Sequence, residues 1–273
     1  MESTAPSSAP AADRVAADSL AARRAVLVAG GWYAAFLGLH VLLAWDNGSI
    51  VSASIPGIGG WLGPFNWAVY AVFAVLAAGV TGWRATGIAR LPAAGWLRIC
   101  APPVLAGLPF LLFGWNLDAS SVVPLLLVGL PLVALNEELF FRGVLLHVLV
   151  PLGVRRSMLW SALAFGFAHL PNVLSGAYPP FVAMQIAATT AGGITLAAIR
   201  LRSGSLWPVL LVHLAIDAMA VPTLTGSATS SPLLLPVLFA WLGANLLLWG
   251  YGWRLVRKVE DEPGWRPSRS AGV

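Results

Sequence analysis

Apolar runs follow one another along almost the whole chain, and this succession limits the fold more than any other feature. There are eight such runs, at about residues 25–45, 65–83, 99–114, 122–149, 155–170, 179–199, 204–221 and 232–253. A helix rises about 1.5 Å per residue, so about 20 apolar residues cross the hydrocarbon layer of a bilayer. Only 10% of the residues are charged, compared with about 25% in soluble domains. The sequence therefore predicts an all-α polytopic membrane protein with about eight transmembrane helices.

Positive charges mark every second connection between these runs. Of the 16 Lys and Arg residues, 15 lie at the N-terminus, near 84–98, 155–156 and 200–202, and in the C-terminal segment. The connections near 46–64, 115–121, 171–178 and 222–231 contain none. Because Lys and Arg are enriched in cytoplasmic loops, this alternation predicts that both termini are cytoplasmic. The charges do not gather on one amphipathic face, so a nucleic-acid partner is not expected.

Composition divides the chain into a membrane domain and two tails. Residues 1–24 are rich in Ala, Ser and Pro at their start and are expected to form a disordered cytoplasmic tail. Residues 25–253 are expected to form the helical transmembrane domain, and residues 254–273 a cytoplasmic C-terminal tail. The Ala/Gly/Arg-rich composition hints at a bacterium of high genomic GC content, so we expect a multi-pass protein of a bacterial cell membrane.

The sixteenth positive charge, Arg142, lies inside the run 122–149 together with Glu137 and Glu138. A charge at the bilayer centre costs on the order of 2.5–3.5 kcal/mol, so such groups pair, line a wet cavity or have a function. Glu138 and Arg142 are four residues apart and share a helix face, which predicts an ion pair. Glu137 is turned about 100° away and points elsewhere. Glu137 is therefore the candidate general base.

Two further runs bring ionisable side chains to a similar depth. Phe165 and His169 share one helix face, and so do His213 and Asp217. At about 1.5 Å per residue from the cytoplasmic ends, Glu137, His169 and Asp217 lie about 18, 21 and 20 Å deep, and His213 about 14 Å. We therefore expect a single polar cluster near the middle of the bilayer.

A carboxylate with two imidazoles in such a cluster can activate water and stabilise the oxyanion formed at a carbonyl. No Ser or Cys is placed as a nucleophile, so direct attack by water, with or without a metal, is favoured, and peptide hydrolysis is the natural reaction. We interpret His40 as a structural histidine, because it has no partner at comparable spacing.

Three motifs in this order resemble those of the CPBP intramembrane proteases, which include the type II CAAX prenyl proteases and the Abi proteins linked to bacteriocin processing and self-immunity. The resemblance covers residues 122–221, and the third motif carries Asp where the family has Asn or Asp. The motifs are Glu137-Glu138-x-x-x-Arg142, Phe165-x-x-x-His169 and His213-x-x-x-Asp217.

This resemblance implies a role for each motif residue. Glu137 would be the base that activates water, and His169 would assist it by polarising the water or as a metal ligand. His213 and Asp217 would form the oxyanion-stabilising pair. The supporting residues would be Glu138, Arg142 and Phe165.

The family is described as metalloproteases, although this sequence has no H-E-x-x-H pair. Glu137, His169 and His213 could bind zinc with one open coordination position, and we slightly favour activation of water without metal. The expected partners are the lipid bilayer and a membrane-associated peptide or protein substrate, cleaved near its C-terminus. Two other functions stay open: a non-catalytic scaffold or bacteriocin-immunity-type protein, and a proton-coupled transporter that uses the cluster as a relay.

Overall fold

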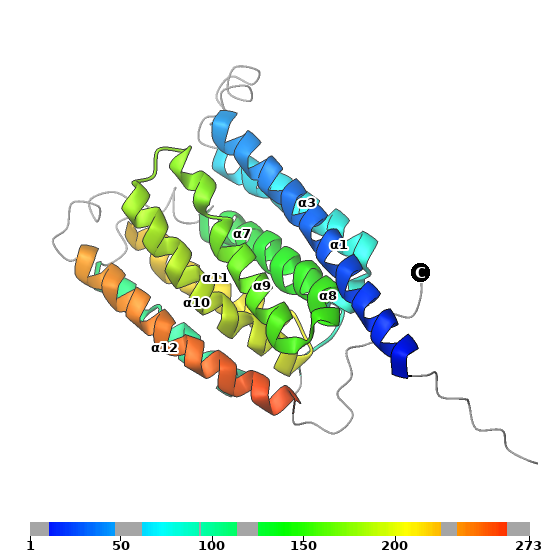
Figure 1. The fold of residues 1–273 in the computed structure, drawn as a ribbon. Coiled ribbons are helices and arrows are strands. Elements are labelled where there is room, and N and C mark those ends of the chain that lie inside the picture. Colours follow the sequence, from blue (N-terminus) through cyan, green and yellow to red (C-terminus); the bar gives the residue numbers. More distant parts are fainter. Residues whose placement is uncertain (1–10, 47–61, 93, 114–124, 225–233, 261–273) are drawn as a thin grey trace, which may run out of the picture.

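The computed structural model describes residues 11–46, 62–92, 94–113, 125–224 and 234–260, and these residues form helices and turns without a strand (Figure 1). The all-α prediction is confirmed for them. Within these ranges, 3 helices are long and apolar enough to cross a membrane: Asp18–Leu43, Pro179–Ser203 and Leu234–Arg257. Asn66–Thr81, Trp96–Leu105 and Trp207–Ala220 are shorter apolar helices. The count of eight transmembrane helices and the orientation of the termini stay predictions.

The first part of the described chain contains one long helix and several shorter ones. They are α1 (Ala11–Asp46), α3 (Leu62–Thr81), α4 (Trp83–Thr86), α5 (Trp96–Leu105) and the 3₁₀ helix η2 (Leu108–Phe113). The expected run 99–114 is thus divided between α5 and η2.

The expected disordered tail needs a correction, because α1 begins at Ala11 and residues 11–24 are helical. This segment is rich in Ala and Arg, which have high helix propensity, and it continues into the apolar part of the same helix. At the other end, α12 extends past the expected boundary at 253 to Glu260. The remaining tail residues, 1–10 and 261–273, lie outside the described residues.

The predicted run 122–149 is one continuous helical segment from Leu125 to Leu149 whose hydrogen-bonding pattern changes along its length. A π-helical turn, η3 (Leu125–Gly129), is followed by α7 (Leu130–Glu138), a second π-helical segment, η4 (Leu139–Leu145), and α8 (Leu146–Leu149). Every residue of η4 is buried, so this segment lies at the centre of the protein.

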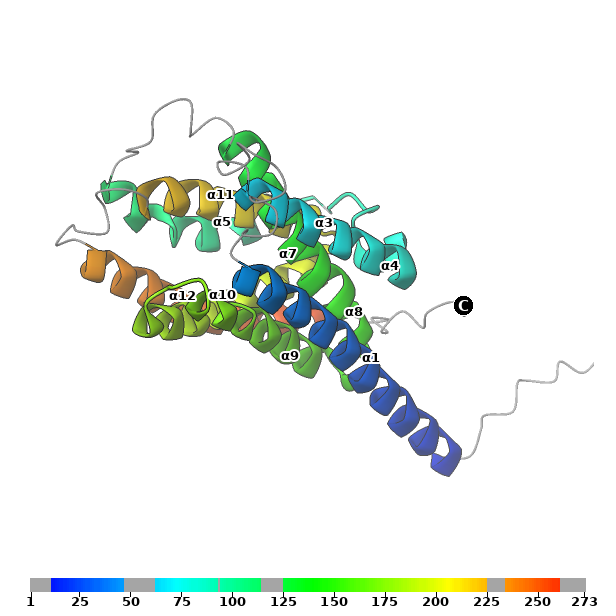
Figure 2. The same cartoon turned by 90° about the horizontal axis from the view of Figure 1, so that it is seen from above.

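The remaining elements surround this central helix. They are the 3₁₀ turn η5 (Val150–Leu152), α9 (Val154–Phe167), the 3₁₀ turn η6 (Leu170–Val173), α10 (Pro179–Ser203), α11 (Trp207–Leu224) and α12 (Leu234–Glu260). α10 lies between α9 and α12, while α11 lies beside α5 and α7 (Figure 2).

Small residues and aromatic rings fill the core in different places. Along α10, buried small residues such as Gly193 and Ala197 let α9 and α12 approach closely, and the Thr195 hydroxyl donates a hydrogen bond to the carbonyl of Leu248 at 2.7 Å. On the opposite side, Phe36 of α1 stacks on Phe140 of η4, with ring centroids 4.6 Å apart. The close approach of helix backbones at small residues, as along α10, is typical of helix packing in membranes.

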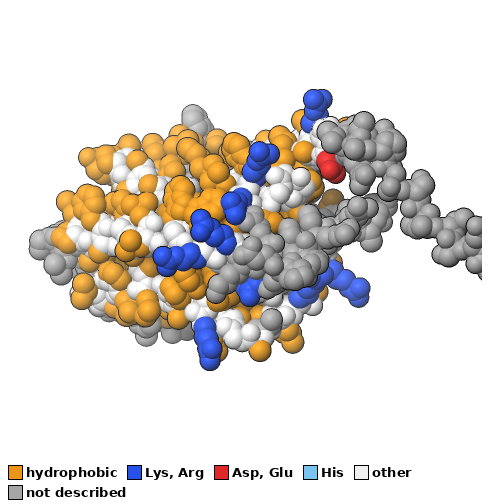
Figure 3. All heavy atoms as spheres, turned by 60° about the horizontal axis from the view of Figure 1, so that its bottom comes forward, with side chains coloured by type: hydrophobic (Ala, Val, Ile, Leu, Met, Phe, Trp, Pro, Cys, Tyr) orange, Lys and Arg blue, Asp and Glu red, His pale blue; other side chains and the backbone are white. Residues whose placement is uncertain are grey.

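Lys and Arg side chains gather on one face of the protein, among hydrophobic side chains (Figure 3). Arg200, at the end of α10, also holds the chain after α4 in place. Its Nε and Nη2 donate to the carbonyls of Thr86 and Ala85, each at 3.1 Å. Gly87 follows with a φ of 81°, a conformation that favours glycine. A cation thus satisfies the last carbonyl groups of this short helix.

Candidate active site

The predicted ion pair between Glu138 and Arg142 is present, and neither side chain is exposed. Arg142 Nη1 lies 2.9 Å from Glu138 Oε1. The guanidinium group lies over the ring of Phe165, 4.0 Å from its centroid, which is a cation–π contact. Phe165 therefore supports the cluster from α9, as a flat surface against which the cation packs.

The same Glu138 oxygen makes a second contact, which the sequence did not reveal. His213 Nδ1 lies 2.6 Å from Glu138 Oε1 and donates a hydrogen bond to it. The bond joins α11 to α7 across 75 positions of sequence. Glu138 therefore orients the His213 ring and balances the charge of Arg142 at the same time.

The backbone changes from α-helix to π-helix immediately after Glu138. At the end of η4 the carbonyl of Phe141 accepts from the N–H of Leu146, five residues later, and also from the hydroxyl of Ser161, at 2.7 Å. Short π-helical segments are rare and often lie at functional sites. Here the π-helical segment holds Arg142 next to the two carboxylates that precede it.

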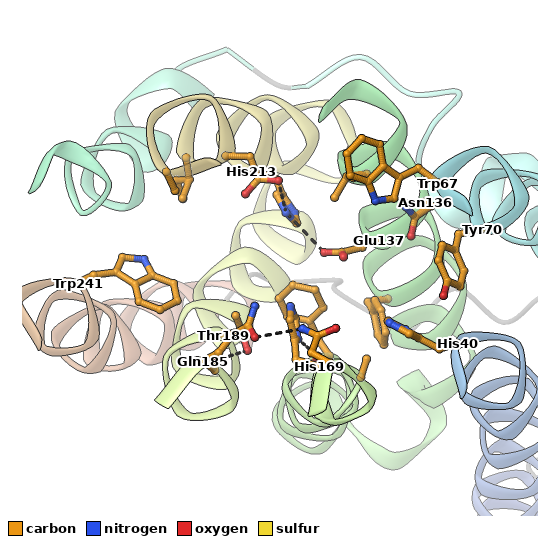
Figure 4. Close-up of a pocket in the computed structure, with 18 of the residues that line it drawn as sticks. His40, Trp67, Tyr70, Asn136, Glu137, His169, Gln185, Thr189, His213 and Trp241 are labelled. Carbon is orange, nitrogen blue, oxygen red and sulfur yellow. Dashed lines mark hydrogen bonds and ion pairs between the residues drawn. The ribbon is translucent and has the colours of Figure 1, made fainter. Parts of the chain in front are cut away.

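The other nitrogen of His213 faces two carboxylates. His213 Nε2 lies 3.5 Å from Glu137 Oε2 and 3.4 Å from Asp217 Oδ2. Both distances exceed the usual 2.9–3.0 Å of a well-formed N–H···O bond. Figure 4 shows Glu137 and His213 pointing toward one another across the cavity. Because Nδ1 already donates to Glu138, Nε2 is a donor only in the protonated ring. The three surrounding carboxylates of Glu137, Glu138 and Asp217 balance the charge of that ring. The protonated His213 therefore keeps an Nε2–H donor available for a further acceptor.

His169 directly follows α9 and faces the cavity from the side opposite His213 (Figure 4). Its Nδ1 lies 3.0 Å from the carbonyl oxygen of Phe165, to which it donates. In the neutral ring, donation by one nitrogen leaves the other as an acceptor. His169 Nε2 can therefore accept a proton or orient a water molecule.

These side chains share one cavity of about 340 Å³. Glu137, His169, His213 and Asp217 all line it. Its remaining wall is largely aromatic, with Phe36, Trp67, Tyr70, Phe110, Phe141, Phe165, Phe181 and Trp241. A mainly apolar cavity with a few converging polar groups is typical of binding sites for peptides and small molecules.

Five further polar residues line the cavity, and the sequence reasoning did not place them there. They are His40, Asn136, Asn172, Gln185 and Thr189. His40, interpreted from the sequence as structural, lines the cavity, and its Nδ1 is buried without a hydrogen-bond partner among the described residues. Gln185 and Thr189 are polar, four residues apart and in an apolar run, which is a signal that could have identified them.

The candidate zinc ligands predicted from the sequence are Glu137, His169 and His213. In residues 11–46, 62–92, 94–113, 125–224 and 234–260, no group of three or more His, Cys, Asp and Glu side chains is arranged to hold a metal ion. His213 Nδ1 is engaged by Glu138 and His169 Nδ1 by the Phe165 carbonyl, so a metal could be bound only through the Nε2 atoms of these rings. The spacing of the described side chains does not form a closed set of zinc ligands.

Comparison with protein families identifies the segment that contains all these motifs. Residues 119–219 match the family model described as Type II CAAX prenyl endopeptidase Rce1-like. No curated protein and no solved structure matches the chain. Together with the long apolar helices, the match supports an integral membrane protein. Residues 119–219 thus carry an Rce1-like domain, which confirms the resemblance to the CPBP proteases over that segment.

Proposed function

We propose that the protein is an intramembrane endopeptidase, which hydrolyses a peptide bond near the C-terminus of a membrane-associated substrate. One observation carries the proposal. Glu137, His169, His213 and Asp217 come from three separate parts of the chain and line one cavity, inside the segment that matches the Rce1-like family.

The first step is activation of water by Glu137. A water molecule between Glu137 and His169 can donate one proton to the carboxylate and the other to His169 Nε2 in a hydrogen bond. Glu137 accepts the proton as the water oxygen attacks the carbonyl carbon of the substrate. Positioned acid–base groups of this kind contribute about 10²–10⁴-fold to a rate. His169 serves to orient the water, because its ring is fixed by the Phe165 carbonyl.

The second step is stabilisation of the oxyanion by His213. The attack places negative charge on the former carbonyl oxygen, and His213 Nε2–H is the donor that faces the cavity. Glu138 holds the opposite nitrogen at 2.6 Å, so the ring cannot turn away. Asp217, 3.4 Å from Nε2, keeps this N–H directed into the cavity. Loss of one such oxyanion donor costs roughly 10²–10³-fold in rate in other hydrolases.

The third step is collapse of the tetrahedral intermediate. The carbon–nitrogen bond breaks and the nitrogen takes up the proton held by Glu137. The remaining proton of the new carboxylic acid passes to the amine, so the products are a carboxylate and an ammonium group. Water supplies the oxygen of the new carboxylate and both protons taken up by the nitrogen. Glu137 therefore acts first as base and then as acid, as general acid–base catalysis requires.

The cellular setting is part of the proposal. We place the protein in a bacterial cell membrane because of its Ala/Gly/Arg-rich composition, and we place both termini in the cytoplasm because basic connections alternate with connections that lack Lys and Arg. The basic face in Figure 3 is then the cytoplasmic face. Whether the substrate is prenylated is left to the experiment.

The test is peptide cleavage by the purified protein in detergent, with products identified by mass spectrometry. Peptide mixtures are offered in unmodified and S-farnesylated form. Glu137→Gln and His169→Gln are expected to abolish cleavage, whereas the matched control His147→Gln, in α8 and outside the cavity wall, is expected to cleave like the wild type. Equal cleavage by wild type and Glu137→Gln would overturn the proposal. Binding of peptide without cleavage by the wild type would favour the scaffold function.

A further inference from the structure

Two amide side chains on the cavity wall are joined to each other. Asn172 Nδ2 donates a hydrogen bond to Gln185 Oε1 at 3.2 Å. Both residues line the cavity that contains Glu137 and His169. Each primary amide has two N–H donors and an acceptor oxygen. The pair therefore retains an acceptor, Asn172 Oδ1, and a donor group, Gln185 Nε2, for which the described part of the chain supplies no bonded partner.

The backbone fixes this pair relative to the proposed catalytic group. The N–H of Asn172 donates to the carbonyl of His169 at 3.0 Å, so the amide lies one 3₁₀ turn beyond the histidine. The carbonyl of Asn172 accepts the N–H of Ala177 at 3.0 Å and closes the turn that leads to α10. Gln185 is on the second turn of α10, and its own carbonyl accepts from Thr189 at 2.7 Å.

A peptide that is to be hydrolysed inside a membrane has a specific need. Its backbone cannot be helical at the bond that is attacked, so its N–H and C=O groups lose their intrahelical partners. An unsatisfied polar group in hydrocarbon costs several kcal/mol. The cavity must therefore offer at least one donor and one acceptor at fixed positions near the reacting groups.

Several other polar groups of the wall are engaged within their own helices or lack this combination. Asn136 Nδ2 donates to the carbonyl of Leu132 in its own helix at 3.1 Å. The Thr189 hydroxyl is engaged with the carbonyl of Gln185. The indoles of Trp67 and Trp241 offer a donor only.

We propose that the Asn172–Gln185 pair binds the backbone of the substrate peptide in extended form, with Asn172 Oδ1 accepting a substrate N–H and Gln185 Nε2 donating to a substrate C=O. The inference rests on the proposed function and extends it. The substrate class is a peptide segment that is unwound next to the scissile bond. The two residues are substrate-binding residues and take no part in the proton transfers.

The test measures binding separately from cleavage, in the Glu137→Gln background. The probes are fluorescent dodecapeptide mixtures, unmodified and S-farnesylated. The peptide that the Glu137→Gln protein retains most strongly is then used alone to measure the binding of each variant. Asn172→Ala and Gln185→Met are each expected to weaken its binding roughly 5- to 10-fold, as expected for loss of one hydrogen bond. Asn245→Ala is the matched control, because the Asn245 amide donates to the carbonyl of Trp241 in its own helix at 2.9 Å and is not among the residues that line this cavity, so binding is expected to be retained.

A backbone ester scan of the same peptide separates direct contact from a structural effect. Replacing the contacted N–H by an ester oxygen is expected to weaken binding roughly 5- to 10-fold in the Glu137→Gln protein. It is expected to have almost no further effect when Asn172 is Ala, because the acceptor is already absent. Gln185→Met supplies the same test at the C=O side if Asn172→Ala does not fold.

The outcomes distinguish this inference from the proposed function. The inference would be overturned if the ester weakened binding equally with and without the amide pair at every position. It would also be overturned if no peptide bound. Coupled binding together with no cleavage by the wild type would sustain the amide site and reject hydrolysis. Cleavage by the wild type without this coupling would sustain hydrolysis and reject the amide site.

Discussion

Arg142→Met should strongly destabilise the protein, because it leaves Glu138 buried without its main counter-ion. Both side chains have an exposed fraction of 0%. Met has a similar length and fills much of the same space, so the change removes the charge and the hydrogen bond more than the packing. The loss of unfolding free energy therefore measures the electrostatic contribution of the ion pair between Glu138 and Arg142.

The expected magnitude follows from the geometry. At 2.9 Å, a pair of unit charges attracts by about 6 kcal/mol at an effective dielectric constant of about 20. Desolvation opposes this attraction, and breaking a buried pair in proteins costs about 3–5 kcal/mol. His213 remains bonded to the same Glu138 oxygen at 2.6 Å, so part of the charge stays compensated. We therefore expect about 3 kcal/mol, the lower end of that range.

The assay is unfolding of the detergent-solubilised protein by increasing SDS, followed by the fluorescence of its 13 Trp residues. The double variant Glu138→Gln, Arg142→Met is the key comparison, because it removes both charges. Its loss of unfolding free energy should be smaller than the sum of the two single losses. An unchanged free energy of unfolding in Arg142→Met, or strict additivity in the double variant, would refute the reasoning.

Three further predictions follow from other contacts. Gly193→Ala should lower the free energy of unfolding by about 1–3 kcal/mol through overpacking, because a Cβ there would lie 3.0 Å from Arg142 Nη2 and 3.3 Å from the Cα of Ala162; unchanged SDS unfolding would contradict this. Gly87→Ala should also destabilise the folded protein, because the φ of Gly87 is 81° and the new Cβ would collide with the Arg200 guanidinium. It should increase proteolysis of the chain after α4, and an unaltered digestion pattern would count against that contact. A zinc chelator should leave peptide cleavage unchanged, whereas loss of cleavage that added zinc restores would establish a metal site.

The sequence predicts the ion pair and the cluster because both depend on local spacing and on depth. Glu138 and Arg142 are four residues apart on one helix, so the period of the helix is enough to bring them together. Glu137, His169 and Asp217 could be assigned similar depths from the rise per residue alone. Such reasoning identifies which groups can meet in an apolar environment.

The remaining features depend on how the helices rotate and pack, which spacing does not determine. The bond from His213 to Glu138 requires α11 to present one face to α7. The position of His40 in the cavity wall requires α1 to pack against η4, through Phe36 and Phe140. The helical start at Ala11 is not predicted from the sequence, because the Pro and Ser residues that precede it do not favour a helix.

The π-helical segment η4 makes the candidate site sensitive to chain length as well as to side-chain chemistry. Deleting one residue between Leu139 and Leu145 would let an ordinary α-helix form through this region. A π-helical turn takes up one residue more than an α-helical turn, so the helices on either side would keep nearly the same rotational phase after the deletion. The residues inside the segment, Arg142 among them, would instead change the direction in which they point. Deletion of a neighbour of Arg142 would thus test whether the extra residue of the π-helical segment is what directs this side chain toward Glu138.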